Sequence, residues 1–343
     1  MNRAAAGSIV AIGQDDPLDK KSLRADAPAR RARVNRPWVA ELLTALYIGL
    51  IGAIAQASGL FYVLFPELGA LSHDVFKRPE GAWARSPVLL VLTTTLAALG
   101  GTLITRHLPY GVPAVLLDVG WSALVIGVLR SPFAPALSAG LMPLVLGIRS
   151  GLYPPSILFG TAVLAVASLA WRRIGWSLPA PASLDPDDDI VERAPAEYGW
   201  VPFFVAFLLL AILTGERLGL RLVLFPPLTV IGFETFAHPT HCPWAGRPAA
   251  LLAACGLTAT VGVACASWVE PLPLAAMLSI LAGGGILWLL DVYVPPALAV
   301  GLLPFVMSRP EWSFPLAVLI GTALQLGTFA AWRASVRLRR APG

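Results

Sequence analysis

Residues 248–268, PAALLAACGLTATVGVACASW, form an apolar run of helical length that contains no charged residue. About 20 such residues cross the hydrocarbon core of a bilayer as one α-helix. Seven further runs in the chain are of similar length and mostly apolar. They comprise residues 38–62, 86–107, 111–129, 154–172, 200–222, 272–290 and 313–333. The sequence therefore predicts an all-α, polytopic membrane protein with about eight transmembrane helices.

The composition indicates the same class of protein. Of the 343 residues, 57% are hydrophobic and only 13% are charged, and the mean hydropathy is +0.72. A soluble domain carries about 25% charged residues, so this chain has too few polar residues to cover the surface of a soluble protein. The three cysteines form no CxxC pair and no disulfide framework. We expect the lipid bilayer to be the main partner.

Four shorter apolar segments lie between the long runs. They are residues 63–76, 133–148, 223–236 and 295–308, which are too short or too interrupted by proline and glycine to span comfortably. Irregular backbone is tolerated at membrane depth only where it is buried in protein or lines a wet cavity. We therefore expect short re-entrant or interfacial segments.

The two halves of the chain resemble each other. Residues 135–145 read PALSAGLMPLV, and residues 296–306 read PALAVGLLPFV at a shift of 161 positions. Shared alanine and leucine alone would not also place proline, glycine and tryptophan in one register. The further matches at this shift, or at one residue less, are Pro87 with Pro248, Gly101 with Gly262, Trp171 with Trp332 and Gly59 with Gly219. The sequence predicts an internal duplication, with repeats at 38–176 and 198–335.

The number of passes in each half decides how the repeats are related. An even number brings the second half in with the same orientation as the first, which predicts parallel repeats about an axis along the membrane normal. If one short segment spans in each half, the number becomes odd and the repeats are inverted. The sequence leaves both arrangements open.

Charged segments flank the repeats. Residues 1–37 form a mixed-charge tail without an apolar signal region, residues 177–197 an acidic, proline-rich linker, and residues 336–343 a basic tail. Four aspartates in the first tail argue against the alternative, a mitochondrial presequence. The basic residues favour both termini on the cytoplasmic side of a bacterial-type inner membrane, with Arg106 and Arg172 inside and Lys77, Arg78 and Arg85 outside. They form no basic stripe with aromatic residues, so we expect no nucleic-acid partner.

Residues 293–304 carry a family resemblance. Tyr293-Val294-Pro295-Pro296-Ala297, followed by a Leu-Pro stretch, resembles the His-Pro-Pro-Ala segment of the HPP family of integral membrane proteins. The loop CPWAGRP at 242–248 is similar to an earlier loop of that family. The resemblance covers about 225–335, with a more degraded copy at 65–175. A usual member carries one unit of about four spans, so this chain looks like a fused double.

The sequence departs from the family pattern at its signature histidine. Val294 stands at the histidine position in the second half, and Phe133-Ala134-Pro135 lacks both the histidine and the first proline. Some plant members are implicated in nitrite movement across a chloroplast membrane. The resemblance therefore implies transport of a small solute or anion.

Asp118 is the main candidate for an ion pathway, because it lies inside the predicted span 111–129. A carboxyl group near the middle of a membrane helix costs about 2.5–3.5 kcal/mol on insertion scales, so it should face the protein interior or water. It would couple transport to protons or cations, or it would only pair with a neighbouring hydroxyl group or arginine. Glu67 and Glu234, in the short segments, are candidates for lining a pore or cavity.

Two arginines and one charged pair are further candidates. Arg85 and Arg247 precede predicted helices, and a positive helix N-terminus beside an arginine is a natural anion site; the alternative is ordinary snorkelling at the interface. Arg130 and Asp291 occupy corresponding positions at the ends of two spans. They would pair across the pseudo-twofold axis, or serve only as structural interfacial charges.

No pattern predicts a metal, a cofactor or an enzyme. His238, His241 and Cys242 do not have the spacing of a zinc site and lack a fourth ligand. HExxH, paired carboxylates and a Ser/His/Asp set are not found. Paired broken segments in corresponding positions of two halves are the best sequence pointer to a midplane binding site. We therefore expect a transporter or channel for a small polar or anionic solute; the alternative is a non-transporting membrane scaffold or sensor.

Overall fold

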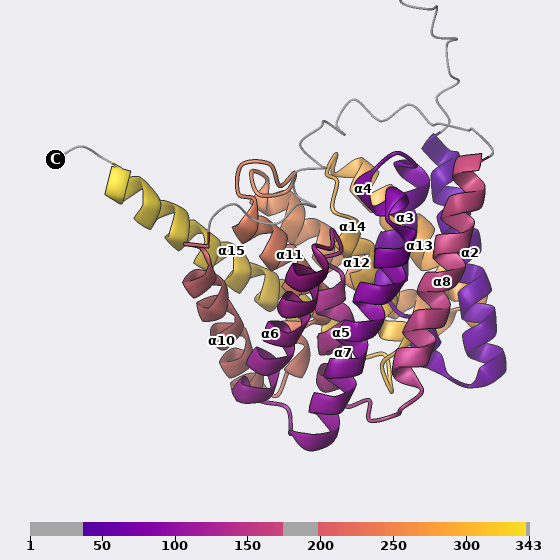
Figure 1. Ribbon diagram of the computed structural model, residues 1–343, viewed down its shortest axis with the longest axis horizontal. Coiled ribbons are helices and arrows are strands. Elements are labelled where there is room, and N and C mark those ends of the chain that lie inside the picture. Colours follow the sequence, from indigo (N-terminus) through magenta and orange to yellow (C-terminus); the bar gives the residue numbers. More distant parts are fainter. Residues whose placement is uncertain (1–36, 174–197, 341–343) are drawn as a thin grey trace, which may run out of the picture. The chain divides into compact units, whose positions relative to one another are not determined.

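The computed structural model describes residues 37–173 and 198–340, and this part of the chain is helical without any strand (Figure 1). Eight helices are long and apolar enough to cross a membrane. They are α2 (Pro37–Ser58), α5 (Pro87–His107), α6 (Val112–Leu129), α8 (Tyr153–Arg173), α10 (Val201–Leu218), α12 (Pro248–Trp268), α13 (Leu272–Leu289) and α15 (Ser313–Arg340). The predicted all-α fold is confirmed, and the chain is an integral membrane protein.

Each half also contains two short helices where the sequence predicts short segments. These are α3 (Glu67–Lys77) and α7 (Ala136–Leu146) in the first half, and α11 (Pro226–Ala237) and α14 (Pro295–Leu302) in the second. Single turns accompany them: η1 (Phe61–Val63), α4 (Ala82–Arg85), η2 (Arg221–Leu224) and η3 (Leu303–Phe305). The predicted tail at 1–37, apart from its last residue, and the linker at 177–197 lie outside the described residues, and α15 continues beyond the predicted boundary at residue 335.

Proline and glycine set several helix boundaries at corresponding places in the two halves. Pro87 and Pro248 begin α5 and α12, where a missing amide hydrogen costs nothing. Gly59 and Gly219 follow α2 and α10 with φ of 70° and 67°, a conformation that glycine adopts without strain. Residues that match in the sequence therefore begin or end corresponding helices in the two halves.

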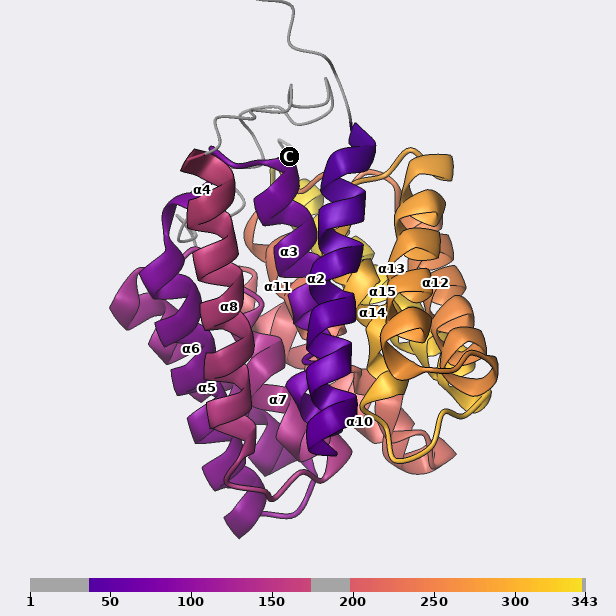
Figure 2. The same cartoon turned by 90° about the vertical axis from the view of Figure 1, so that its right-hand side faces the viewer.

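The segment 59–77 runs the whole length of α8, although only part of it is helical. The hydroxyl groups of Tyr62 and Ser150 lie 3.0 Å apart just before α8 begins. Leu68 packs against Gly160 near the middle of α8, and Phe76 contacts Trp171 near its end. Figure 2 shows α3 beside α2 and α8. This segment completes a pass, with an irregular first part and a helical second part.

The segment 131–149 completes a second such pass beside α5. Ser131 accepts a hydrogen bond from Thr93 at 2.7 Å, Gly140 crosses Gly101 at backbone contact, and the carbonyl of Arg149 accepts one from Arg106 at 3.0 Å. In the second half, η2 and α11 follow α15 in the same way, and α14 crosses α12 at Gly262. The number of passes in each half is thus even, and both halves enter from the same end.

The two ends of the helical unit differ in charge. We call them the Glu41 end, where α2 begins, and the Arg106 end, where α5 finishes. Lys77 contacts Glu41, whereas Arg106 contacts the segment just before α8. The expectation that Arg106 shares a side with Arg172 is therefore wrong, since Arg172 lies at the other end of α8. Lys77, Arg78 and Arg85 share the end of Arg172, because the segment 59–77 is a full pass.

The two halves are interleaved rather than merely adjacent. Figure 2 shows α2 next to α13 of the other half, and the side chain of Gln56 accepts a hydrogen bond from the amide of Leu272 at 3.1 Å. The short helices also pair across the halves, α3 with α14 and α7 with α11. At the Arg106 end, the Arg221 guanidinium lies 4.7 Å from the Tyr110 ring centroid, and burial raises the pKa of that phenol to about 12.

Candidate functional site

Asp118 lies at the crossing of α5 and α7 in the interior of the first half. Its side chain is completely buried. The crossing is formed by Gly101 and Gly140, which lack side chains and so allow the two backbones to touch. A β-carbon at Gly140 would lie 3.2 and 3.3 Å from the two carboxyl oxygens of Asp118. The two glycines thus make the space that the carboxyl group occupies.

Glu67 is buried nearby at the first turn of α3. Its polar neighbour is Ser138 of α7, two residues before the glycine that faces Asp118. Tyr153, at the start of α8, donates a hydrogen bond from its hydroxyl to the carbonyl of Ala139 at 2.9 Å, between Ser138 and Gly140 in the chain. Four elements of the first half therefore bring two acids predicted from the sequence into one cluster with hydroxyl groups.

The Asp118 carboxyl group has no hydrogen-bond partner among the described residues. Both of its oxygens are buried, as is the hydroxyl group of Ser122, which also has no partner, and the Glu67 carboxyl group has only the Ser138 hydroxyl as a hydrogen-bonding neighbour. A buried polar group without a hydrogen bond costs about 1–3 kcal/mol, and an unpaired buried charge costs more. A proton or a bound ion at Asp118 would offset this cost. Within residues 37–173 and 198–340, Asp118 pairs with neither a hydroxyl group nor an arginine.

The second half has no equivalent of this cluster. Ser279 occupies the position of Asp118, at the crossing of Gly262 and Gly301, and its hydroxyl donates to the carbonyl of Gly301 at 2.9 Å. Gly283 occupies the position of Ser122. The polar side chain at this backbone crossing therefore has a hydrogen-bond partner in the second half, whereas the carboxyl group at the crossing in the first half has none. We call Asp118, Glu67, Ser122, Ser138 and Tyr153 the acid cluster.

A charged network lies at the Glu41 end, toward which α3 runs from Glu67. The Glu41 carboxylate lies 3.1 Å from His73 and 3.6 Å from Lys77. The next residue after His73 is Asp74, whose carboxylate binds Arg78 at 2.6 Å and accepts a hydrogen bond from the hydroxyl of Tyr293. Tyr293 comes from the segment that resembles the HPP motif. This network therefore connects α2 and α3 to the other half.

Glu234 does not join the acid cluster. It is buried near the end of α11, where its carbonyl accepts a hydrogen bond from the amide of His238. At a shift of 160 positions it corresponds to Asp74, so it belongs to the Glu41 end. Burial and the nearby charge of Glu234 raise the pKa of the Cys242 thiol, which disfavours the thiolate that a metal would need.

The predicted pairing of Arg130 with Asp291 is wrong. Asp291 pairs with Arg247 instead, at 3.5 Å, and Arg247 also donates to the Asp291 carbonyl. Arg130 forms no ion pair with any described residue. Arg130 and Asp291 do correspond structurally, since both have φ of 49° at the ends of α6 and α13. The two positions share a backbone conformation rather than an interaction.

The segments that resemble the HPP motif begin short helices. Pro135 precedes α7, Val294 precedes α14, and Pro295 and Pro296 form its first turn. All four residues lie inside the protein, with the Val294 side chain completely buried. Arg85 ends α4 at the Glu41 end.

Comparison of the chain with protein-family models, with curated proteins and with solved structures finds no match.

Several members of these sites were not predicted. Ser122, Ser138 and Tyr153 are common residue types inside apolar runs, and only the fold places them beside the acids. Asp74 could have been found, because it aligns with Glu234 in the register of the repeats. His73 and Lys77 are one helical turn apart and face the same way, which is a signal visible in the sequence.

Proposed function

We propose that this protein is a transporter that moves a small polar or anionic solute together with a proton. The observation that carries the proposal is the complete burial of Asp118 without a hydrogen bond or ion pair to any described residue, with a second buried acid, Glu67, nearby. Ionisable groups held in this way inside a membrane protein are typical of proton relays and ion pathways. A structural carboxyl group would be expected to have a partner, as Asp74 does.

The acid cluster sets a condition on the solute. An anion beside two ionised carboxylates would meet strong repulsion in a medium of low dielectric constant. It could pass only when both groups carry a proton, so the movement of an anion and the movement of a proton would be linked. The two carboxyl groups would in this way couple protons to the anion transport that the HPP resemblance implies.

We propose further that the chain arose by internal duplication and that it is related to the HPP family. The two halves have the same order of long and short helices and enter from the same end, which supports parallel repeats. Pairs of broken passes in corresponding places are typical of transporters. On this view the acid cluster arose in one half only, and the chain is a non-enzymatic carrier.

We also propose that the Glu41 end is cytoplasmic. The basic residues at this end outnumber those at the other, which favours its cytoplasmic placement in a bacterial-type inner membrane. At the Glu41 end lie Lys77, Arg78, Arg85, Arg130, Arg172, Arg173, Arg247 and Arg333; at the Arg106 end lie Arg106, Arg149, Arg217, Arg221 and Arg309.

Purified protein in liposomes would test the proposed activity. Uptake of nitrite, nitrate and formate would be measured with and without an inwardly directed proton gradient, against protein-free liposomes. We expect saturable, protein-dependent uptake of at least one anion that the proton gradient accelerates. Folded protein that moves none of them under either condition would contradict the proposal and favour a scaffold or sensor. Uptake of cations or neutral solutes alone would contradict the anion preference.

A further inference from the structure

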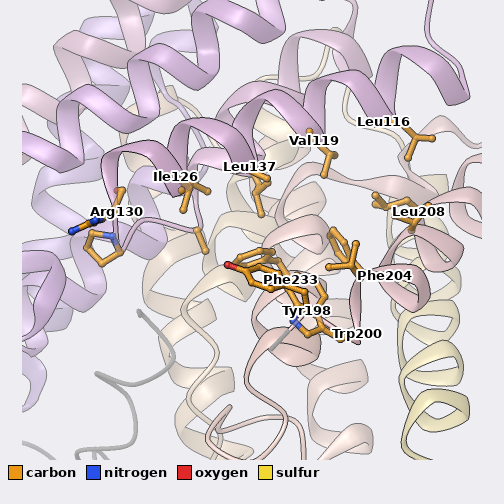
Figure 3. Close-up of a pocket in the computed structure, with 18 residues that line it drawn as sticks. Leu116, Val119, Ile126, Arg130, Leu137, Tyr198, Trp200, Phe204, Leu208 and Phe233 are labelled. Carbon is orange, nitrogen blue, oxygen red and sulfur yellow. The ribbon is translucent and has the colours of Figure 1, made fainter. Parts of the chain in front are cut away.

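An apolar groove lies between α6 of the first half and α10 of the second. Its volume is about 380 Å³, and α6 lines it from Leu116 to Arg130. Figure 3 shows Leu116 at one end of the row from α6 and Arg130 at the other, with Phe204 and Phe233 facing α6 across the groove. Arg130 and Ser131 follow the end of α6, and Tyr198 lies beside Phe233 on the other wall of the groove (Figure 3).

The corresponding interface on the other side of the molecule is closed by charged groups. There Glu41 of α2 contacts His73, Lys77 and the backbone at Gly284 of α13. At the groove, the residues in the same positions are Val201, Phe233, Ala237 and Ala123. Polar contacts that would close the interface are therefore replaced by apolar side chains, and a space remains between the helices.

The length of the groove fits one acyl chain. The 15 residues from Leu116 to Arg130 extend about 21 Å at a rise of 1.5 Å from each residue to the next, which is more than the roughly 15 Å depth of one leaflet of the hydrocarbon core. A helix from another chain is about 10 Å across and would require a much larger volume than this groove offers. The groove therefore fits a lipid tail better than a second copy of the chain.

The charge at the end of the groove fits a phosphate group. Arg130 is exposed and has no ion pair among the described residues. Arginine binds phosphate through paired hydrogen bonds, and tyrosine and tryptophan, here Tyr198 and Trp200, are enriched at the level of lipid headgroups. We propose that this groove binds an anionic phospholipid, with an acyl chain along α6 and the phosphate at Arg130.

Native mass spectrometry of the purified protein, titrated with phosphatidylglycerol or phosphatidylcholine of the same chain length, tests this proposal without any measurement of transport. Wild-type protein should retain one tightly bound lipid and prefer phosphatidylglycerol. Gly120→Leu and Gly127→Leu place side chains into the groove, since a β-carbon at either glycine meets no other atom within 4 Å. Both variants should bind the lipid at least about tenfold more weakly.

Matched variants separate groove filling from general damage. Gly285→Leu adds the same side chain to α13, also into open space but away from the groove, and should bind lipid as the wild type does. Arg130→Asn keeps a residue that tolerates positive φ and should lose the preference for phosphatidylglycerol while retaining the lipid; Arg309→Asn is its control. Undiminished retention by both groove-filling variants, or an unchanged preference in Arg130→Asn, would overturn the proposal.

Discussion

The hydroxyl group of Tyr293 donates a hydrogen bond to the carboxylate of Asp74, although the two residues are 219 positions apart and belong to different halves of the chain. Arg78 binds the same carboxylate oxygen from one helical turn along α3. The charged groups of Lys77 and Arg78 also form cation–π contacts with the Tyr293 ring, at 5.4 and 5.8 Å from its centroid. A residue of the segment that resembles the HPP motif thus fastens α3 to the second half.

Tyr293→Phe should weaken this connection without removing the ring. Hydrogen bonds to charged groups contribute about 1.5–3 kcal/mol, and Asp74 retains Arg78, so we expect a loss near the lower limit. Denaturation of the detergent-solubilised protein would measure it. Tyr198→Phe is the control, because Tyr198 is exposed and its hydroxyl forms no hydrogen bond with a described residue; an equal loss in both variants would show that the bond to Asp74 contributes nothing.

Gly101→Ala should be strongly destabilising. Its β-carbon would collide with the carbonyl oxygen of Gly140, which is backbone and cannot turn aside. Overpacking of this kind costs about 1–3 kcal/mol or more. Gly120→Ala on α6 meets nothing within 4 Å and should gain up to about 1 kcal/mol of helix propensity. Similar melting temperatures for the two variants would contradict the close crossing of α5 and α7.

The full pass of segment 59–77 can be tested by cysteine labelling. In a background in which Cys242, Cys255 and Cys265 are replaced by serine, single cysteines at Gly59 and Glu80 should react with a membrane-impermeant reagent from opposite sides of the membrane. These residues precede and follow the pass at different ends of the unit. Labelling from the same side would show that the segment turns back within the membrane.

Asp118→Ser should give a folded protein at least as stable as the wild type. Serine at the corresponding position in the second half donates to the carbonyl of Gly301, and a serine at 118 could donate to Gly140 in the same way. Replacing an unpartnered buried carboxyl group removes a cost of about 1–3 kcal/mol. Thermal unfolding would measure this, with Asp74→Ser, which removes a paired carboxylate, expected to be destabilised.

The sequence predicts the helices much better than their arrangement. The run 248–268 coincides with α12, because uninterrupted apolar residues leave few alternatives in a bilayer. The segments 59–66 and 131–135 are different, since they complete passes in irregular conformations supported by α8 and α5. No periodicity marks such backbone, so the sequence predicts the wrong end for both Arg106 and Lys77.

For a related reason, the sequence predicts only some of the residues of the site. Asp118 is conspicuous because a carboxyl group is rare inside an apolar run, and Glu67 because it begins a short segment. The sequence does not show that Tyr153 lies beside them, because its position depends on how α8 packs on α7. Arg130 and Asp291 correspond in register, yet Asp291 pairs with Arg247, because corresponding positions in two repeats do not have to be in contact.

The most direct test of the proposed function is proton movement through Asp118→Asn. Liposomes with a pH-sensitive dye inside would be given an inward gradient of an anion that the wild type transports, and the acidification of the lumen would be recorded. We predict acidification with the wild type and with Asp291→Asn, whose carboxyl group is exposed, and none with Asp118→Asn, although that variant is folded. Acidification by Asp118→Asn at the wild-type rate would contradict a role for this buried carboxyl group in carrying the proton.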